Sequence, residues 1–341
     1  MARTELKLLP PFSHIYVEEE LFAPPWAKRL ERIKSRFPKA TIVAIGSLQE
    51  FTQRRTASWN DQKRSPKLVV ARKRGELVYP CSDVAPNFGH PHFYYAVPMQ
   101  NCLYDCEYCY LQGMYTSANL VYFLNQDEMV ERTVELQREL GEIYVCIAYD
   151  NDILAMESLL GVTADWVRGL RQHPKATVEV RTKSANFHAI KTLEPAGNFI
   201  LAWTLSPQIV TERFEAGTPG LSSRLKSLVK ALRAGWRVRL CLDPLLPIKG
   251  WREAYQGLFE AVDSESVWDQ LEDVSYGLFR MPKQLLRQAK KARPDSALLH
   301  SPQAIEGRGL STLAGTDQDE LLDYVRGQLE SRIDPAKVWE T

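Results

Sequence analysis

Long apolar runs are missing from this 341-residue sequence. No stretch of 18 or more apolar residues occurs, so nothing in it is long enough to cross a membrane as a helix. The first residues, Met1–Lys7, lack the apolar segment of a secretory signal. Cysteine is also sparse, and six residues are too few for a disulfide scaffold in a chain of this size. We therefore expect a cytoplasmic protein in a reducing compartment, with no membrane association.

Charge of one sign is not in excess either, because 43 basic and 42 acidic residues leave a net charge of +1. Such a balance gives no general attraction to nucleic acids, which would have to bind local patches. Two basic patches are visible. The first has Asp61 as its only acid and contains Arg54, Arg55, Lys63, Arg64, Lys67, Arg72, Lys73 and Arg74; the second has no acid and contains Arg280, Lys283, Arg287, Lys290, Lys291 and Arg293. Each patch is either a solvated face or a phosphate-binding surface.

The sequence does contain a regular alternation of strand-type and helical segments. Its hydrophobic content of 45% is that of an ordinary globular chain with a large core. Strands are predicted at 92–98, 143–149, 177–182, 199–205, 237–242 and 274–279, with helices between them at 126–140, 152–172, 222–233 and 251–262. Strands that alternate with helices favour a parallel sheet built from βα units.

The segments on either side of this region differ from it. A helix at 26–37 and strands at 41–45 and 67–71 indicate an α/β prefix over residues 1–90. A helix at 317–333 indicates a helical extension over residues 296–341. We predict that the middle segment, residues 91–295, is a partial (β/α)6 barrel of the TIM type. Functional residues of such barrels gather at the C-terminal ends of the strands.

Half of the cysteines fall in one loop after the first of these strands. Cys102, Cys106 and Cys109 form a C-x3-C-x2-C array. Thiolates are the preferred ligands of iron–sulfur clusters; four would complete a [4Fe–4S] cluster, and three leave one iron open for chemistry. A structural zinc site is the alternative, but it usually needs a fourth Cys or His at short spacing, and none follows. Tyr108, just before the last cysteine, could cover one side of the bound group.

An open iron beside polar strand ends indicates a radical SAM arrangement, in which S-adenosylmethionine (SAM) binds the fourth iron and is cleaved to a 5′-deoxyadenosyl radical. The run C-E-Y-C-Y-L-Q at Cys106–Gln112 resembles the cysteine loop of the spore photoproduct lyase family. Further segments resemble the family in the same order across residues 12–265: Ile15–Glu20, Ser65–Leu68, Val180–Lys183, Phe214–Thr218 and the pattern Gly250, Trp251, Tyr255, Leu258, Phe259. The sequence is identified as a member of that family, with the radical SAM form of the barrel.

The resemblance implies a function. A [4Fe–4S] cluster and SAM would generate a 5′-deoxyadenosyl radical that abstracts hydrogen from a thymine-dimer lesion in DNA, which is then split and repaired. The implied partners of a monomeric enzyme are damaged DNA and a one-electron reductant such as flavodoxin or ferredoxin. A damaged base leaves the duplex stack more easily than an intact one, and the basic patches would bind phosphates. Two alternatives stay open: a radical SAM enzyme acting on another nucleic acid or a peptide, and a non-enzymatic, metal-stabilised nucleic-acid-binding module.

The resemblance also implies cofactor-binding residues. Lys183 and Ser206 would hold the carboxylate and the ribose of SAM, and Asn151 and Asp152 would lie beside the same cofactor. The residues alone allow plainer interpretations, namely a surface lysine at Lys183 and a helix N-cap serine at Ser206.

Four more residues concern the radical path. Tyr108 and Tyr110 match family tyrosines near the lesion, although they could equally be aromatic packing under the cluster. In the family, a cysteine in a segment like C-T-S-D-I-V-G-I-D returns a hydrogen atom to the product radical. Residues 152–157 match the second half of that segment, and an alignment without a gap puts Tyr149 at the position of the cysteine. Cys146 lies three residues earlier, and strand alternation would point it and Tyr149 to opposite sides unless a bulge intervenes. Either Cys146 or Tyr149 is the donor, or this protein does not catalyse the lyase reaction. The plainer interpretation of Cys146 is a buried apolar residue.

The C-terminal part also departs from the family, and two cysteines remain outside the loop. The family's basic, aromatic, Gly-rich segment helps to hold DNA, and its nearest counterpart here, Glu306–Gly309, has no tyrosine. Arg308 is the candidate DNA contact in this segment. Cys241 is interpreted as a core residue, and Cys81 has no assigned role.

Overall fold

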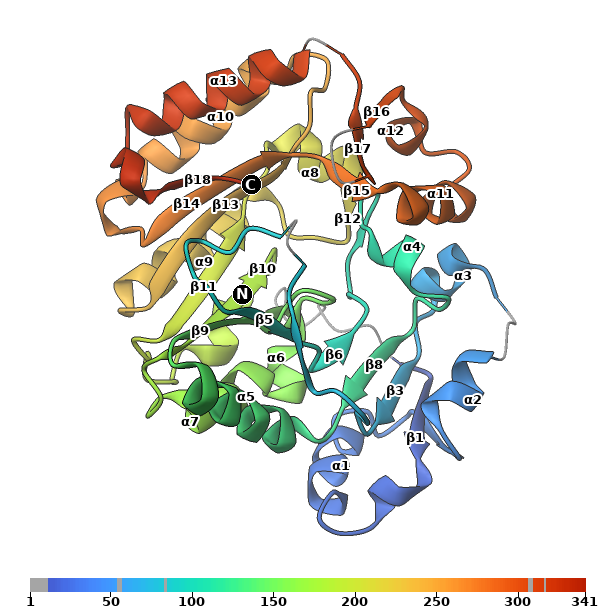
Figure 1. Cartoon of the computed structure of the whole chain (residues 1–341). Helices are drawn as coiled ribbons and strands as arrows, with labels where there is room; N and C mark the ends of the chain where they lie inside the picture. Colours follow the sequence, from blue (N-terminus) through green and yellow to red (C-terminus); the bar gives the residue numbers. More distant parts are fainter. Residues whose placement is uncertain (1–11, 54–56, 83–84, 306–308, 316) are drawn as a thin grey trace, which may run out of the picture.

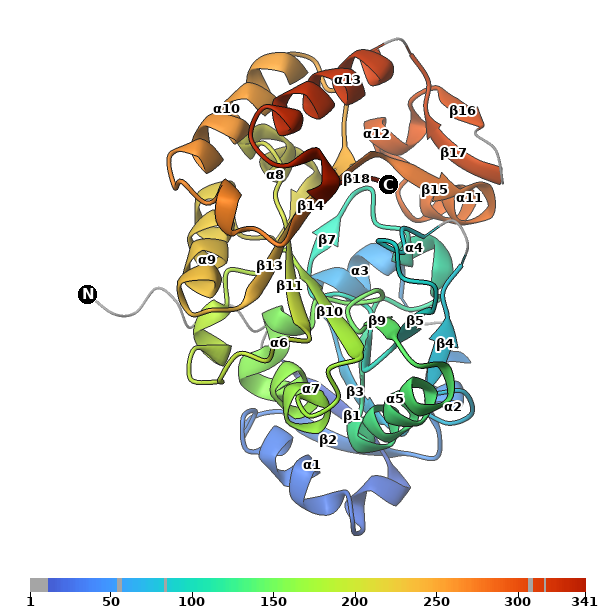
Figure 2. The ribbon, with the colours of Figure 1, turned by 60° about the vertical axis from the view of Figure 1, so that its left-hand side comes forward.

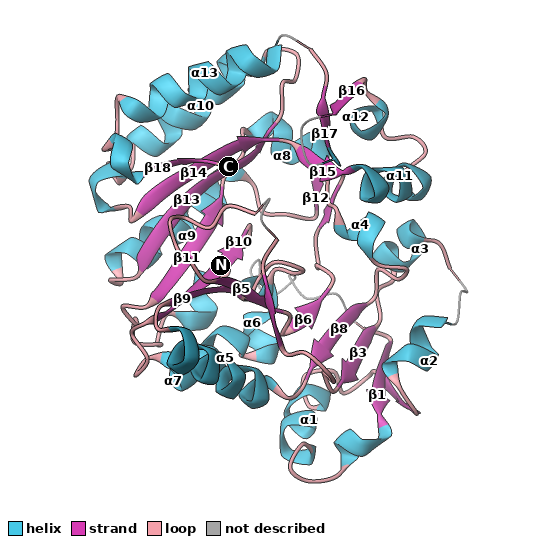
Figure 3. Ribbon diagram, in the orientation of Figure 1, coloured by secondary structure: helices cyan, strands magenta, loops and turns pink. Residues whose placement is uncertain are grey.

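The computed structural model describes residues 12–53, 57–82, 85–305, 309–315 and 317–341. Its main feature is an open, curved sheet with helices along its outer side (Figure 1; Figure 3). The eight strands, from one edge to the other, are β4 (Val78–Pro80), β5 (Phe93–Ala96), β9 (Ile143–Cys146), β10 (Ala176–Thr182), β11 (Phe199–Thr204), β13 (Arg237–Leu245), β14 (Asp273–Leu278) and β18 (Val338–Glu340). Within this sheet, β5, β9, β10, β11, β13 and β14 pair in parallel, whereas β4 is antiparallel to β5. These six parallel strands are the predicted ones, and the partial (β/α)6 barrel is confirmed.

Helices connect the parallel strands and cover the outer face of the sheet (Figure 2). They are α5 (Gln126–Leu140), α6 (Ile153–Leu160), α7 (Val162–Leu170), α8 (Gln208–Phe214), α9 (Leu221–Arg233) and α10 (Trp251–Asp263), with short 3₁₀ turns η2 (Phe187–Ile190) and η3 (Trp268–Gln270). In α10, Tyr255, Leu258 and Phe259 recur on one face and are buried against the sheet. The helix predicted at 152–172 is divided in two, because Gly161 takes a left-handed conformation with φ of 67°.

Two separate apolar clusters mark the two faces of this sheet. The larger cluster lies under the helices and contains Val145, while the smaller one contains Phe88, Tyr144 and Ile200. Side chains alternate along a strand, so Tyr144 and Cys146 of β9 point to the concave side and Val145 to the helices. The concave side of the barrel is therefore where Cys146 lies.

A second, smaller sheet lies beside the barrel (Figure 1). Its strands, in order, are β2 (Thr41–Ile45), β1 (His14–Glu18), β3 (Leu68–Ala71), β8 (Leu120–Phe123) and β6 (Met99–Gln100), accompanied by η1 (Glu19–Phe22), α1 (Ala27–Lys34), α2 (Leu48–Gln53) and α3 (Trp59–Arg64). Strands β2, β1, β3 and β8 are mutually parallel, and β6 is antiparallel to β8. Both sheets contain strands from before and after residue 90, and the domain boundaries at residues 90 and 295 stay predictions.

The C-terminal part adds a three-stranded antiparallel sheet and more helices. Its elements are β15 (Arg280–Pro282), α11 (Lys283–Ala292), α12 (Ala297–His300), β16 (Gln303–Ile305), β17 (Leu310–Leu313), α13 (Asp317–Glu330) and the turn η5 (Pro335–Lys337), after which β18 joins the edge of the barrel sheet. The predicted helix at 317–333 is confirmed as α13. Among the described residues, no helix is long and apolar enough to cross a membrane.

Candidate active site

The cysteine loop is held between segments that are distant in sequence. Its short strand β7 (Asp105–Cys106) pairs with β12 (Glu215–Ala216), and the Glu107 amide donates to the Phe214 carbonyl at 2.7 Å. The loop ends in the helix α4 (Leu111–Met114), which packs on α11. A Cβ atom at Gly113 would collide with the Leu285 backbone, so glycine permits this close approach.

One residue from each basic patch binds the cysteine loop. The Lys63 ammonium donates to the carbonyls of Cys102 and Tyr104, both at 2.7 Å. The Arg293 guanidinium donates to Gln112 at 2.5 Å and pairs with Asp105. These two cations hold the loop in place. Arg54 and Arg55 of the first patch lie outside the described residues, as does Arg308.

The three thiols lie close enough together to affect one another's acidity. Burial raises the pKa of each thiol, that of Cys102 to about 12. Neighbouring cysteines raise the pKa of Cys102 and Cys106 further, while Lys63 and Lys183 act in the opposite direction. Thiolates in such a site need a cation bound to sulfur. An iron–sulfur cluster with three cysteine ligands fits this set of donors.

The described residues contain no group of three or more Cys, His, Asp or Glu side chains placed to hold a single metal ion. The ligands of a [4Fe–4S] cluster bind different iron atoms, so they stand farther apart than the ligands of one ion. This finding does not argue against a cluster, and no fourth Cys or His stands beside the three cysteines among the described residues.

Glu215 is the centre of a buried hydrogen-bond network beside the loop. Its carboxylate accepts from the Tyr108 hydroxyl, from the Ser206 hydroxyl at 2.9 Å, and from Arg224 in a fully buried ion pair. Burial would raise the pKa of Glu215, but Lys183 and Arg224 outweigh it and lower that pKa. The Lys183 ammonium lies 5.5 Å from the centre of the Tyr108 ring. The structure thus brings Lys183, Ser206 and Tyr108 together at Cys106.

Sequence reasoning had not assigned a role to Glu215 or Arg224. Glu215 falls in the segment Phe214–Thr218, which was noted only for its resemblance to the family. Its contacts come from β7, the end of β11 and α9, and no local pattern connects these elements. An acidic residue beside a glycine-containing turn is common in protein sequences, so this pattern alone could not identify Glu215 as a site residue.

Asn151 and Asp152 are engaged with the protein backbone. Asp152 caps α6 by accepting from the Ala155 amide at 3.1 Å, and it accepts from the Thr182 hydroxyl and the Lys183 amide at 2.7 Å each. The Asn151 amide group donates to the Met99 carbonyl at 2.7 Å. Asp152 therefore fixes the end of β10, from which Lys183 extends.

Tyr110 connects the cysteine loop to the end of β9. Its hydroxyl donates to the Tyr149 carbonyl at 2.6 Å, and the Tyr115 hydroxyl donates to the Asp150 carboxylate at 2.5 Å. Tyr110 is thus adjacent to the backbone of Tyr149, and the role of both residues in a radical path stays a prediction.

Cys146 and Tyr149 do not compete for one position. Strand β9 ends at Cys146, so the predicted strand at 143–149 is too long and the alternation argument does not extend to Tyr149. Cys146 is 1% exposed, and its sulfur lies 3.8 Å from a Glu179 oxygen. The Tyr149 side chain instead interacts with Cys81: burial raises the pKa of the Cys81 thiol, and the interaction with Tyr149 offsets part of that rise. Pairing of β4 with β5 brings Cys81 there, and its amide donates to the Phe93 carbonyl at 2.8 Å.

Glu179 belongs to a buried ionic network on the concave side of the barrel. It accepts from Arg181 at 3.0 Å and from Arg239 at 2.5 Å, and Arg239 also pairs with Asp273. Burial favours the neutral carboxyl, but the two guanidinium groups prevail and lower the pKa of Glu179 to about 2. Cys241 is fully buried near Arg181, in agreement with its interpretation as an interior residue.

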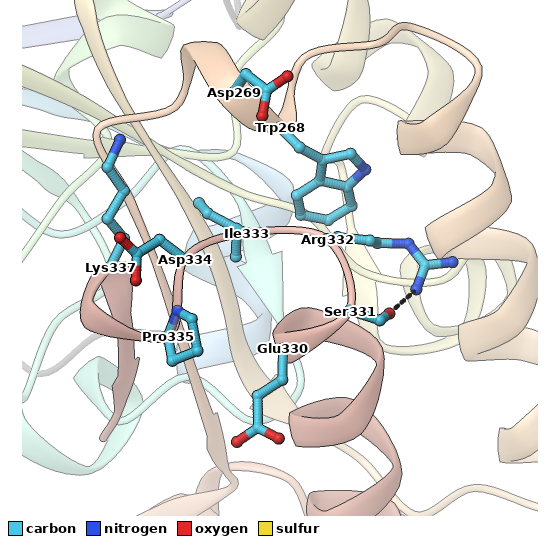
Figure 4. A pocket seen from close by; sticks show the side chains of 9 residues that line it. All are labelled: Trp268, Asp269, Glu330, Ser331, Arg332, Ile333, Asp334, Pro335 and Lys337. Carbon is cyan, nitrogen blue, oxygen red and sulfur yellow. Dashed lines mark hydrogen bonds between the residues drawn. The ribbon is translucent and has the colours of Figure 1, made fainter.

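A surface pocket of about 420 Å³ lies away from these residues (Figure 4). It is formed by η3 and the segment after α13, and it includes Trp268, Arg332 and Lys337. Arg332 is paired with Asp263 and Lys337 donates to the Leu271 carbonyl, so both cations already have protein partners. None of the predicted site residues lines this pocket.

Comparison with known proteins gives a consistent result. Spore photoproduct lyase from Bacillus subtilis (strain 168) is 25% identical over 217 residues, which cover 61% of this chain and 63% of that protein. Spore photoproduct lyase from Geobacillus sp. (strain Y412MC61) is 22% identical over 200 residues, covering 56% and 57%. The chain thus matches less than two thirds of the length of these curated relatives.

Solved structures share the fold over nearly the whole chain. Spore photoproduct lyase complexed with dinucleoside spore photoproduct has a TM-score of 0.76 at 20% identity, and a double mutant with bound AdoMet and the same dinucleoside has a TM-score of 0.77 at 19% identity. Each match covers 97% of this chain and 99% of the other. The family model for spore photoproduct lyase matches residues 82–299, which is more than half of the sequence. The chain therefore belongs to the spore photoproduct lyase family.

Proposed function

We propose that this protein is a radical SAM lyase that repairs a thymine-dimer photoproduct in DNA. The observation that carries the proposal is the network at Glu215, whose strand pairs with that of Cys106 and whose carboxylate accepts from Tyr108 and Ser206 and attracts Lys183 electrostatically. Membership of the family supports it, as do the bound AdoMet and dinucleoside spore photoproduct in the relatives' structures.

Three cysteines would ligate the [4Fe–4S] cluster, with Lys183 and Ser206 at the carboxylate and the ribose of SAM. Bound together and reduced by a flavodoxin- or ferredoxin-type donor, cluster and SAM supply the 5′-deoxyadenosyl radical. We assign Asp152 to positioning, because its carboxylate is fully used by backbone and hydroxyl donors that hold Lys183 in place. Asn151 is adjacent, and its carbonyl oxygen has no hydrogen-bond partner among the described residues, so it is free to accept from the cofactor.

Hydrogen return is assigned to Tyr149 with Cys81 behind it. The O–H bond of Tyr149 would break as the product C–H bond forms, and the Cys81 thiol would then give its hydrogen atom to the tyrosyl oxygen. The hydrogen atom first taken from the lesion is then held in a C5′–H bond of 5′-deoxyadenosine; this bond would break as the Cys81 S–H bond forms again, which would regenerate the 5′-deoxyadenosyl radical, so the cycle would need no net reductant. Cys146 is less suitable, because its thiol faces the Glu179 carboxylate inside the barrel.

Variants separate these roles. Tyr149→Phe and Cys81→Ala are expected to stop repair while 5′-deoxyadenosine still forms, whereas Cys146→Ala is expected to repair normally. Loss of repair in a folded Cys146→Ala protein, with normal repair by Tyr149→Phe, would reverse the assignment.

DNA would bind beside the cysteine loop through α11. Lys283, Arg287 and Lys291 are exposed, follow one another at four-residue intervals and so lie on one face of the helix. We call these three residues the α11 stripe. None of them has an ion pair within the described chain, and α11 packs directly on α4 of the loop. A stripe of unpaired cations is suited to a phosphate backbone.

One observation favours a second candidate function, a radical SAM enzyme acting on another nucleic acid or a peptide. A tyrosine, Tyr149, stands where the family has its donor cysteine. Anaerobic incubation of the reconstituted protein with SAM, dithionite and UV-irradiated oligonucleotide distinguishes the two. Repaired thymine supports the lyase, while 5′-deoxyadenosine without repair supports the second candidate. Colourless protein with one zinc ion per chain would contradict both and support a non-enzymatic module.

A further inference from the structure

A second cavity lies against the smaller sheet, beside the cysteine loop. Its volume is about 530 Å³, within the usual range for a small-molecule site. It is bounded by the end of β3, by α2, by one face of β8 and by the segments on both sides of the cysteines. Open α/β sheets commonly bind ligands at the carboxyl ends of their parallel strands, and Arg72, Lys73 and Arg74 directly follow β3.

The lining of this cavity is cationic. Glu18 is its one carboxylate among the described residues, and it is already used, because it accepts from the Leu48 and Arg72 amides at 2.8 Å and from Arg74 at 2.9 Å. The Arg72 side chain pairs with Glu128. Lys73 has no ion pair in the described chain, and its ammonium lies over the rings of Tyr79 and Phe123 at 5.1 and 5.5 Å. Lys73 is therefore the cation available to an anionic ligand.

A buried acceptor in the same cavity has no partner. Asn101 is 1% exposed, and its amide nitrogen donates to the Ser117 and Asn119 carbonyls at 2.8 and 2.7 Å. Its carbonyl oxygen has no hydrogen-bond partner among the described residues. Phe51, Phe123 and Tyr115 add aromatic surface to the lining.

Two residues that line the cavity, Asn101 and Tyr115, connect it to the candidate active site. Asn101 immediately precedes the first cluster cysteine. Tyr115 lines the cavity and donates to Asp150, the residue after Tyr149. An extended strand whose lesion reached Tyr149 could thus place a neighbouring unit in this cavity.

We propose that the cavity binds a nucleotide that flanks the lesion, with its phosphate at Lys73 and its base against Phe123 and Tyr115. The proposal rests on the proposed function, since it takes DNA as the substrate. A cation beside aromatic rings is a common way to bind single-stranded DNA. A free nucleoside phosphate has the same chemistry, and the experiment distinguishes the two.

The test compares a dinucleotide photoproduct with the same lesion inside a longer oligonucleotide. Lys73→Met removes the charge and keeps the packing over the two rings. We expect it to raise the KM for the oligonucleotide about tenfold, with kcat and the KM for the dinucleotide unchanged. Lys73→Arg should restore the oligonucleotide KM, and Lys226→Met, at an exposed lysine on α9, should change nothing. Equal effects on both substrates, or none on either, would overturn the proposal.

Binding measurements keep the test independent of catalysis. Fluorescence anisotropy with undamaged single-stranded oligonucleotides should show weaker binding by Lys73→Met and a log–log salt slope lower by about one. Tight binding of free thymidine monophosphate, with no gain from a longer strand, would instead assign the cavity to a free nucleotide and overturn the inference. If the wild-type protein binds the oligonucleotide through Lys73 but repairs neither substrate, the proposed reaction fails and the cavity assignment stands.

Discussion

Replacing Glu215 with glutamine should destabilise the protein more than any surface change in the same region. Glu215 and Arg224 are both fully buried, and their ion pair also holds the donors Tyr108 and Ser206. Glutamine preserves the shape and one acceptor oxygen but removes the negative charge. Arg224 would then be a buried cation without its counter-charge, and the nearby Lys183 would lose one of its anionic neighbours.

The expected loss follows from the cost of such a charge. Removing one partner of a buried ion pair typically costs about 3–5 kcal/mol, and the remaining hydrogen bonds of glutamine favour the lower end. A protein of ordinary stability, with a free energy of unfolding of about 5–15 kcal/mol, would remain folded. The variant can therefore be purified and measured.

Urea unfolding followed by circular dichroism gives the free energy of unfolding directly. The control is Glu212→Gln, an exposed neighbour on α8 that should change stability by less than about 0.5 kcal/mol. The Glu215→Gln variant should also retain less iron after reconstitution, because β12 supports the strand of Cys106. A variant as stable as Glu212→Gln, with full iron content, would refute the role given to this network.

Three more predictions concern other parts of the molecule. The pKa of Glu179 is lowered to about 2 in the folded protein, so its ion pairs contribute stability above the unfolded-state pKa near 4.5. This contribution is lost as the pH falls towards 2. Glu179→Gln should therefore flatten the acid limb of a stability–pH curve measured by urea unfolding. Gly113→Ala should cost about 1–3 kcal/mol in the same assay by forcing α4 away from α11, whereas Gly257→Ala in α10, where a Cβ meets nothing, should be neutral or stabilising. Alanine at all three positions of the α11 stripe should lower the log–log salt slope of DNA binding by about 2–3, and an unchanged slope would exclude the stripe from the DNA interface.

The sequence identified the elements whose signals are local. The six barrel strands and most helices were found because apolar periodicity and breakers such as Gly235 act within one segment. The spacing of three cysteines likewise indicated the loop that we propose as the cluster site. The split of the helix at 152–172 was missed because a glycine inside a helical pattern does not by itself indicate a left-handed turn, as Gly161 adopts.

The remaining features depend on contacts between distant segments. Strands β6 and β8 join the smaller sheet, and β4 joins the barrel, which no local pattern could show. The same holds for Glu215, whose partners come from several elements, and for Cys81, which reaches Tyr149 only because β4 pairs with β5. The family resemblance located Lys183, Ser206 and Tyr108, but the structure was needed to show that one carboxylate links them.

The most direct test of the central claim uses an oligonucleotide that carries one spore photoproduct. The anaerobically reconstituted protein, SAM and a one-electron reductant are incubated with it, and the digested DNA is analysed by chromatography and mass spectrometry. The lyase assignment predicts that the photoproduct disappears as two thymines appear, with no change in undamaged control DNA. Continued formation of 5′-deoxyadenosine while the photoproduct remains intact would contradict it.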